Sequence, residues 1–115
     1  AMRATLFVNF VRCAVAAVAA LSFTAAPAGG NADAGKQKSQ VCQSCHGADG
    51  NSDNPQFPRL AGQHADYLLK ALQDYKSSAR KNPIMAGFVG NLSEQDMEDL
   101  AAYYARQKGL SVNPR

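Results

Sequence analysis

The segment Cys42-Gln43-Ser44-Cys45-His46 lies just before the middle of the 115-residue chain, and the architecture predicted for this protein is built around it. Two thiols stand three residues apart and an imidazole follows the second thiol directly, which is the C-x-x-C-H signature of c-type haem attachment. One helical turn puts both sulfurs on the same side of the backbone, within reach of the two vinyl groups of a porphyrin. The next residue can then place its imidazole under the ring. The segment predicts one covalent haem c, with His46 on the iron.

Three other uses of the cysteine pair are open to the same residues. A thioredoxin-like redox pair needs a βαβ setting, and the sequence has no alternation of apolar and polar residues long enough to indicate strands. A structural zinc site needs four ligands. His46 and His64 could complete such a set, but the adjacent Cys45 and His46 are poor tetrahedral partners. A disulfide that closes so short a ring would stabilise the fold little, so haem attachment is the favoured interpretation.

Length and charge limit the class of protein. A chain of 115 residues allows one small domain. The formal net charge is +3, but Arg3 and Arg12 belong to an N-terminal segment that we expect to be removed, which leaves ten basic against nine acidic residues, about +1. Two haem propionates would bring the charge near zero. Because there is no block of like charges, no nucleic-acid partner is expected.

Residues 1–28 have the organisation of a secretory signal peptide. Arg3 and Arg12 give a positively charged start, residues 13–26 are an apolar run of about 14 residues, and residues 26–28 supply an A-x-A cleavage site. The run is short for a membrane-spanning helix, which needs roughly 20 residues. An uncleaved anchor is therefore the less favoured alternative.

Removal of this peptide would place the protein in the periplasm, without a stable membrane span. The mature chain would be one domain, residues 29–115. Loss of Cys13 with the signal peptide would leave Cys42 and Cys45 as its only thiols. In an oxidising compartment such a pair becomes a disulfide or is consumed by a cofactor.

The periodicity of the sequence predicts an all-α protein with three or four helices around the haem. Helices are expected over residues 33–43, 64–79 and 93–108, with irregular loops over 47–60 and 81–91.

The last of these helices has the clearest start and end. Ser93 is placed to cap it, with Asp96 at the N3 position of a capping box. Leu92 and Met97 occupy the hydrophobic-staple positions. Gly109 is expected to end the helix.

The second iron ligand decides between an electron carrier and a haem that binds small molecules. The candidates are Met85, Met97 and His64. Met97 is explained as a core residue of the last helix, and His64 opens the second helix. Met85 lies in the apolar loop and belongs to no helical stripe, so it is the favoured ligand. A thioether opposite histidine raises the reduction potential relative to two histidines.

The loop after the motif supplies two further candidates. A ligating imidazole usually donates its other N–H to a carbonyl or carboxylate, and we expect the carbonyl of Pro58, in preference to Pro55, to accept it. Arg59 is either a solvated surface cation or the partner of a haem propionate, whose carboxylate suits its fork. The aromatic residues expected to pack in the core and against the haem are Tyr67, Tyr75, Phe88, Tyr103 and Tyr104.

Four segments together resemble the class I c-type cytochromes, in particular the single-haem domains of bacterial cytochromes c-four and c-five. The segments are residues 41–50, residues 57–63 running into Tyr67-Leu68, Met85, and residues 92–97 with 100–104. They occur in the order typical of the family and cover residues 33–108.

This resemblance implies a cytochrome c fold with His46 and Met85 on the iron and the Pro58 carbonyl on His46. It also implies that the first and last helices cross at a small-residue contact. The residues of that contact would be Ala34 or Gly35 against Leu100 and Tyr103. Two departures stand out: Lys38 occupies a position where many members carry an aromatic, and cytochrome c-four has two such domains.

The function implied by the resemblance is a periplasmic one-electron carrier, not an enzyme. Its expected partners are a cytochrome bc-type donor and a terminal oxidase or reductase. One alternative is the haem subunit of a periplasmic dehydrogenase complex. A less favoured one is a ligand-binding or peroxidatic haem protein.

Overall fold

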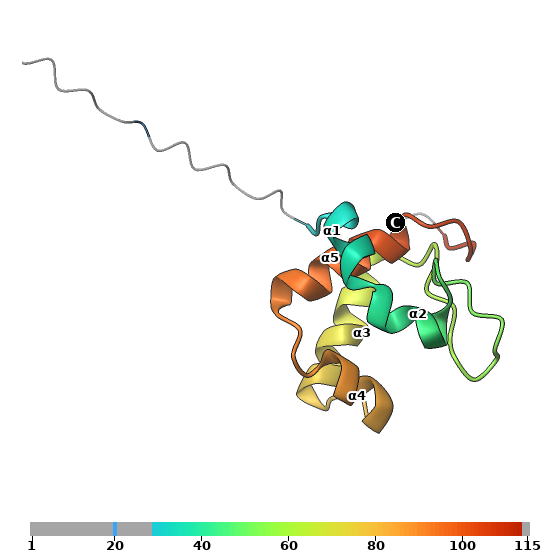
Figure 1. The fold of residues 1–115 in the computed structure, drawn as a ribbon. Coiled ribbons are helices and arrows are strands. Elements are labelled where there is room, and N and C mark those ends of the chain that lie inside the picture. The colour runs from blue at the N-terminus through green and yellow to red at the C-terminus, as the bar shows by residue number, and fades with distance from the viewer. Residues whose placement is uncertain (1–19, 21–28, 114–115) are drawn as a thin grey trace, which may run out of the picture.

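A computed structural model describes residue 20 and residues 29–113 of the chain. The predicted signal peptide, residues 1–28, lies outside the described residues apart from Ala20, so it stays a prediction. The described part forms five helices and no strand: α1 (Ala32–Lys38), α2 (Gln40–His46), α3 (Ala65–Ser77), α4 (Pro83–Val89) and α5 (Glu94–Ala105) (Figure 1). The all-α prediction is confirmed. Among these helices none is both long and apolar enough to cross a membrane.

The single helix predicted over residues 33–43 is in fact two helices. The Ser39 hydroxyl donates to the Lys36 carbonyl oxygen at 2.7 Å, and Cys42 N donates to the Ser39 carbonyl at 2.9 Å. A serine that bonds to the backbone in this way competes with helix continuation. The whole haem motif therefore lies in α2, which ends at His46. The next residue, Gly47, has a positive φ of 86°, a conformation that favours glycine.

The loop predicted over residues 81–91 was wrong, because Pro83–Val89 form helix α4. Asn82 caps this helix with its side chain and Pro83 occupies its first turn, where proline's missing N–H costs nothing. Gly87 inside this helix and Gly90 at its end lower the helix propensity of the segment. The periodicity of the sequence therefore did not indicate a helix here.

Helices α3 and α5 are both shorter than predicted. α3 ends at Ser77, since Ser78 adopts a left-handed conformation (φ 66°). α5 starts with a complete capping box, in which Ser93 Oγ accepts from Asp96 N at 3.1 Å and Ser93 N donates to Asp96 Oδ2 at 2.9 Å. It ends at Ala105, before Lys108 and Gly109.

Helix α5 is the centre of the core. Its apolar face packs with Leu68 of α3, and the buried cluster consists of Leu68, Leu100, Ala101, Tyr103 and Tyr104. Helix α1 crosses α5 on another side (Figure 1). At the crossing a Cβ on Gly35 would lie 2.0 Å from the Asp99 carbonyl oxygen and 2.8 Å from Tyr103 Cβ. The predicted small-residue contact with Tyr103 is present at Gly35.

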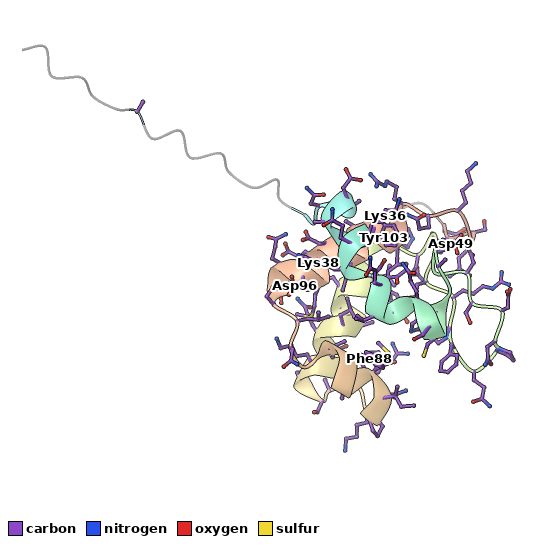
Figure 2. All side chains as sticks on the ribbon, in the orientation of Figure 1. Lys36, Lys38, Asp49, Phe88, Asp96 and Tyr103 are labelled. Carbon is purple, nitrogen blue, oxygen red and sulfur yellow. The ribbon has the colours of Figure 1, made fainter. Side chains whose placement is uncertain are left out.

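Lys38 joins the same two helices through charge. Its Nζ lies 2.6 Å from Asp99 Oδ2 and 2.8 Å from Asp96 Oδ1, and Figure 2 shows Lys38 beside Asp96. Asp99 is only 3% exposed, and its Oδ1 also accepts from Asn31 N at 2.7 Å and from Gln95 Nε2 at 2.8 Å. These donors compensate for the burial of the Asp99 carboxylate. The ion pairs of Lys38 with Asp96 and Asp99 therefore stabilise the contact between α1 and α5.

These contacts shift the pKa of each charged group. Burial alone would raise the pKa of Asp99, but the bonds from Lys38, Asn31 and Gln95 together lower it below its usual value. The bond from Lys38, with those from Ser93, lowers the pKa of Asp96 to about 2. The bonds to Asp96 and Asp99 raise the pKa of Lys38.

Replacing Gly35 by alanine is predicted to destabilise the fold, because the new methyl group would overlap the backbone of α5. Forced overpacking of this kind costs about 1–3 kcal/mol, measurable as a lower midpoint of urea unfolding. Gly87→Ala is the control, since a Cβ there would meet nothing within 4 Å. Equal stability of the two variants would contradict the close crossing.

Lys38→Met is predicted to lower the free energy of unfolding at pH 7 by about 1 kcal/mol, allowing for the partial exposure of Lys38. Because the carboxylate pKa values are lowered in the folded state, their contribution is present above about pH 4 and is lost as the pH falls toward about 2. The difference between wild type and variant should therefore shrink over that range. Lys36→Met, at an exposed position of α1, should show no such pH-dependent difference in urea unfolding.

Candidate haem-binding site

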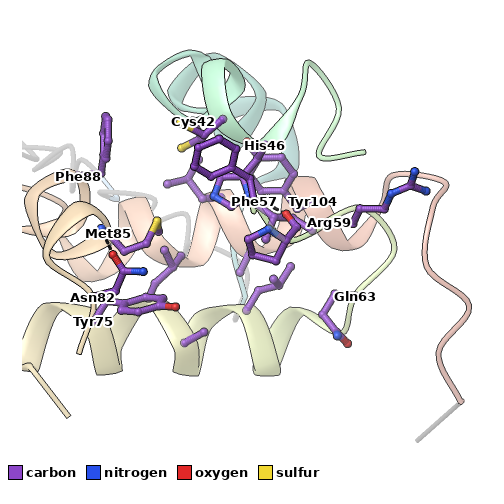
Figure 3. A pocket seen from close by; sticks show the side chains of 18 of the residues that line it. Cys42, His46, Phe57, Arg59, Gln63, Tyr75, Asn82, Met85, Phe88 and Tyr104 are labelled. Carbon is purple, nitrogen blue, oxygen red and sulfur yellow. Dashed lines mark hydrogen bonds between the residues drawn. The ribbon is translucent and has the colours of Figure 1, made fainter. Parts of the chain in front are cut away.

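A cavity of about 390 Å³ lies between helices α2, α3, α4 and α5 and the loop that joins α2 to α3. This is the size of a pre-formed small-molecule site. Figure 3 shows His46 and Met85 on two different walls of it. Most of the wall is apolar; its lining includes Val41, Phe57, Leu60, Leu68, Leu72, Ile84, Phe88, Leu100 and Ala101.

The two motif cysteines lie on the wall formed by α2. Both thiols are half-buried, line the cavity and are not joined in a disulfide. Burial raises the pKa of the Cys42 thiol, whereas a reactive redox cysteine has a lowered pKa. No group of three or more histidine, cysteine, aspartate or glutamate side chains able to hold a metal occurs in the described part of the chain. The described residues also form no strand, so the βαβ setting of a thioredoxin-like pair is missing from this part of the chain.

His46 is buried at the end of α2, and its ring is held in one orientation. Its Nδ1 lies 2.8 Å from the carbonyl oxygen of Pro58, which is the contact expected from the sequence. A carbonyl only accepts, so Nδ1 must carry the proton, and Nε2 keeps the lone pair that a metal needs. The Phe57 ring packs edge-on against the imidazole, with centroids 6.5 Å apart.

The position of Pro58 is set by the hydrogen bonds of its loop. The Gly50 carbonyl accepts from Leu60 N at 2.8 Å and from Ala61 N at 3.2 Å, which closes the loop beyond the proline. Gly62 N donates to the Tyr104 carbonyl of α5 at 2.9 Å. The carbonyl that orients His46 is thereby fastened to the core.

Arg59 has a partner that the sequence did not indicate. Its Nε donates to the Ser52 carbonyl oxygen at 3.1 Å, so it helps to fold the loop. The side chain is exposed and also lines the cavity. Arg59 is thus a surface residue at the edge of the cavity, and its pairing with a haem propionate stays a prediction.

Of the three candidates for the second iron ligand, only Met85 shares the cavity with His46. It is half-buried in the first turn of α4. Met97 is a core residue of α5 and is 2% exposed, and His64 is the residue before α3; neither lines the cavity. The geometry of the cavity thus separates candidates that the sequence alone had to rank.

Some lining residues were not predicted. Phe57, Gln63, Asn82 and Ile84 line the cavity, and the Asn-Pro pair at 82–83 is a helix-start signal that could have revealed α4. Of the five aromatic residues expected in the core or against the haem, Tyr67, Tyr75, Phe88 and Tyr104 line the cavity. Tyr103 instead packs at the α1–α5 crossing.

The residues present fit a covalent haem. An apolar cavity offers two free thiols and an oriented imidazole on one wall and a thioether on another. The Cys42, Cys45 and His46 motif implies one covalent haem c.

Comparison with known proteins agrees with this site. Residues 32–106 match the Cytochrome c family. Cytochrome c4 from Pseudomonas aeruginosa is 54% identical over 83 residues, which cover 72% of this chain and 41% of that protein. Cytochrome c-554(548) from Halomonas halodenitrificans is 39% identical over 82 residues, which cover 69% of this chain and 99% of that protein.

A solved structure is similar as well. The reduced recombinant cytochrome c4 from Pseudomonas stutzeri superposes with a TM-score of 0.67 at 50% identity, covering 70% of this chain and 47% of that one. The chain thus spans about half the length of the cytochrome c4 relatives it matches. With the family match over residues 32–106 and the site described above, the chain belongs to the cytochrome c family.

Proposed function

We propose that this protein is a periplasmic one-electron carrier whose haem iron is held by His46 and Met85. The observation that carries the proposal is that Met85, alone among the three candidates, lines the cavity that contains His46. With both axial positions filled by protein, no open position is left for a substrate. The protein would then transfer electrons without acting as an enzyme.

The chain's own residues would set the properties of this centre. The bound haem supplies the one-electron iron couple. The Pro58 carbonyl keeps the imidazole of His46 oriented, and the thioether of Met85 favours a higher reduction potential than a second histidine would. The apolar wall excludes water, which also tunes the potential. In this proposal Arg59, which is exposed and lines the cavity, would pair with a haem propionate.

The rim of the cavity supports exchange with protein partners. Val41 of α2 and Ile84 and Phe88 of α4 are apolar and line the cavity. Apolar side chains gathered around a haem site would favour contact with a protein partner. The partners in the proposal are a cytochrome bc-type donor and a terminal oxidase or reductase, with a periplasmic dehydrogenase complex as the alternative.

Replacing Met85 by leucine tests the ligand. The variant is expected to lose the iron–sulfur charge-transfer band of the oxidised protein, to have a lower reduction potential and to bind carbon monoxide when reduced. The wild type should bind no carbon monoxide at neutral pH. Absorption spectra and potentiometric titration measure these changes.

Met97→Leu is the matched control, because it makes the same chemical change at a buried methionine outside the cavity. It should keep the band and cost less than about 1.5 kcal/mol of stability. A Met85→Leu protein with an unchanged spectrum would refute the ligand assignment. Carbon monoxide binding by the wild type would favour a ligand-binding haem protein instead.

A further inference from the structure

Helix α4, which carries Met85, is held at few points. It has seven residues, and a helix this short is not stable by itself in water. Its one buried residue is Val89, at its C-terminal end. Ile84 and Phe88 line the cavity and are not part of the helical core, and a Cβ on Gly87 would meet nothing within 4 Å. The N-terminal turn, where Met85 lies, is therefore not held by the core cluster of the protein.

The side chain of Asn82 caps this turn. Its Oδ1 accepts from Ile84 N at 3.0 Å and from Met85 N at 3.2 Å. Figure 3 shows Asn82 bonded to Met85 beside Tyr75. The second bond ends on the backbone of Met85 itself, so it acts on the residue whose thioether faces the cavity.

The segment before Asn82 is also anchored. Arg80 N donates to the Asp74 carbonyl oxygen at 3.0 Å, and the Arg80 guanidinium lies 4.8 Å from the centre of the Tyr75 ring. The chain is thus held to α3 at Arg80, two residues before Asn82, and Asn82 itself bonds to the first turn of α4.

We propose that Asn82 is a positioning residue for Met85: its cap keeps the first turn of α4 wound and so holds the thioether at the cavity. The inference rests on the proposed function, in which Met85 binds the iron. Without the cap, α4 would unwind from the end that carries Met85, while Val89 keeps the other end in place. The thioether would then leave its position more often.

The test is the binding of imidazole to the oxidised holoprotein, because imidazole competes with the thioether for the iron. Asn82→Ala should bind imidazole about fivefold more tightly than wild type, the factor that corresponds to the loss of one N-cap. The iron–sulfur band should weaken at correspondingly lower imidazole concentrations. Asn82→Ser, which can still cap, should behave nearly as wild type. Asn82 is exposed, so its truncation leaves no cavity in the core.

Asn31→Ala is the matched control. Asn31 caps α1 by the same geometry, accepting from Asp33 N at 2.9 Å and from Ala34 N at 3.1 Å. Asn31→Ala should lower the urea unfolding midpoint about as much as Asn82→Ala does, and it should leave the affinity for imidazole unchanged. Equal tightening in Asn31→Ala and Asn82→Ala would mean that general destabilisation is the cause, and would overturn the inference. So would failure of Asn82→Ser to restore wild-type affinity.

Met85→Leu separates this inference from the proposed function. If Met85→Leu keeps the iron–sulfur band, the ligand assignment itself has failed. If Met85→Leu loses the band while Asn82→Ala binds imidazole as the wild type does, the ligand assignment stands and only the role of Asn82 is refuted.

Discussion

The hydrogen bond between His46 and Pro58 is the interaction on which the site depends. A histidine can ligate iron only with the correct nitrogen free, and the carbonyl at 2.8 Å selects that tautomer. The bond also joins α2, which carries the haem motif, to a loop with little regular structure. That loop is fastened in turn to α5 through Gly62 and Tyr104. The orientation of one imidazole thus follows from contacts that reach the centre of the core.

Helix α5 forms the centre of the core and contacts α1 in two ways, through close backbone packing and through ion pairs. At Gly35 the backbones of α1 and α5 approach so closely that no side chain fits between them. Next to this contact, Lys38 pairs with Asp96 and the buried Asp99. Close backbone packing fixes the distance between the helices, and the directional charge pairs fix their rotation. A domain this small buries limited apolar surface, so each of these contacts weighs heavily in its stability.

The two walls that face each other across the cavity are supported unequally. The His46 wall is tied to the core through the Pro58 loop, whereas the Met85 wall is a seven-residue helix with one buried side chain and an asparagine cap. Local opening in proteins concentrates where buried contacts are few. The Met85 side is therefore the side of the cavity on which local opening would start.

The cofactor, the start of α5 and the partner of His46 could all be predicted from the sequence alone. The spacing of Cys42, Cys45 and His46 implied the cofactor, because covalent attachment and ligation need those groups within one helical turn. Ser93 and Asp96 located the start of α5, since a capping box is a local interaction. The preference for Pro58 as the partner of His46 agreed with the contact in the structure. These are short-range features, and sequence spacing describes them well.

The tertiary structure decided the rest. The helix break at Ser39 and the helical state of residues 83–89 depend on weak local preferences that the surrounding contacts settle. The charge cluster of Lys38 with Asp96 and Asp99 joins residues about sixty positions apart, which no local pattern relates. Met85, Met97 and His64 could only be ranked from the sequence, because which of them meets His46 in one cavity depends on how helices far apart in the chain pack together.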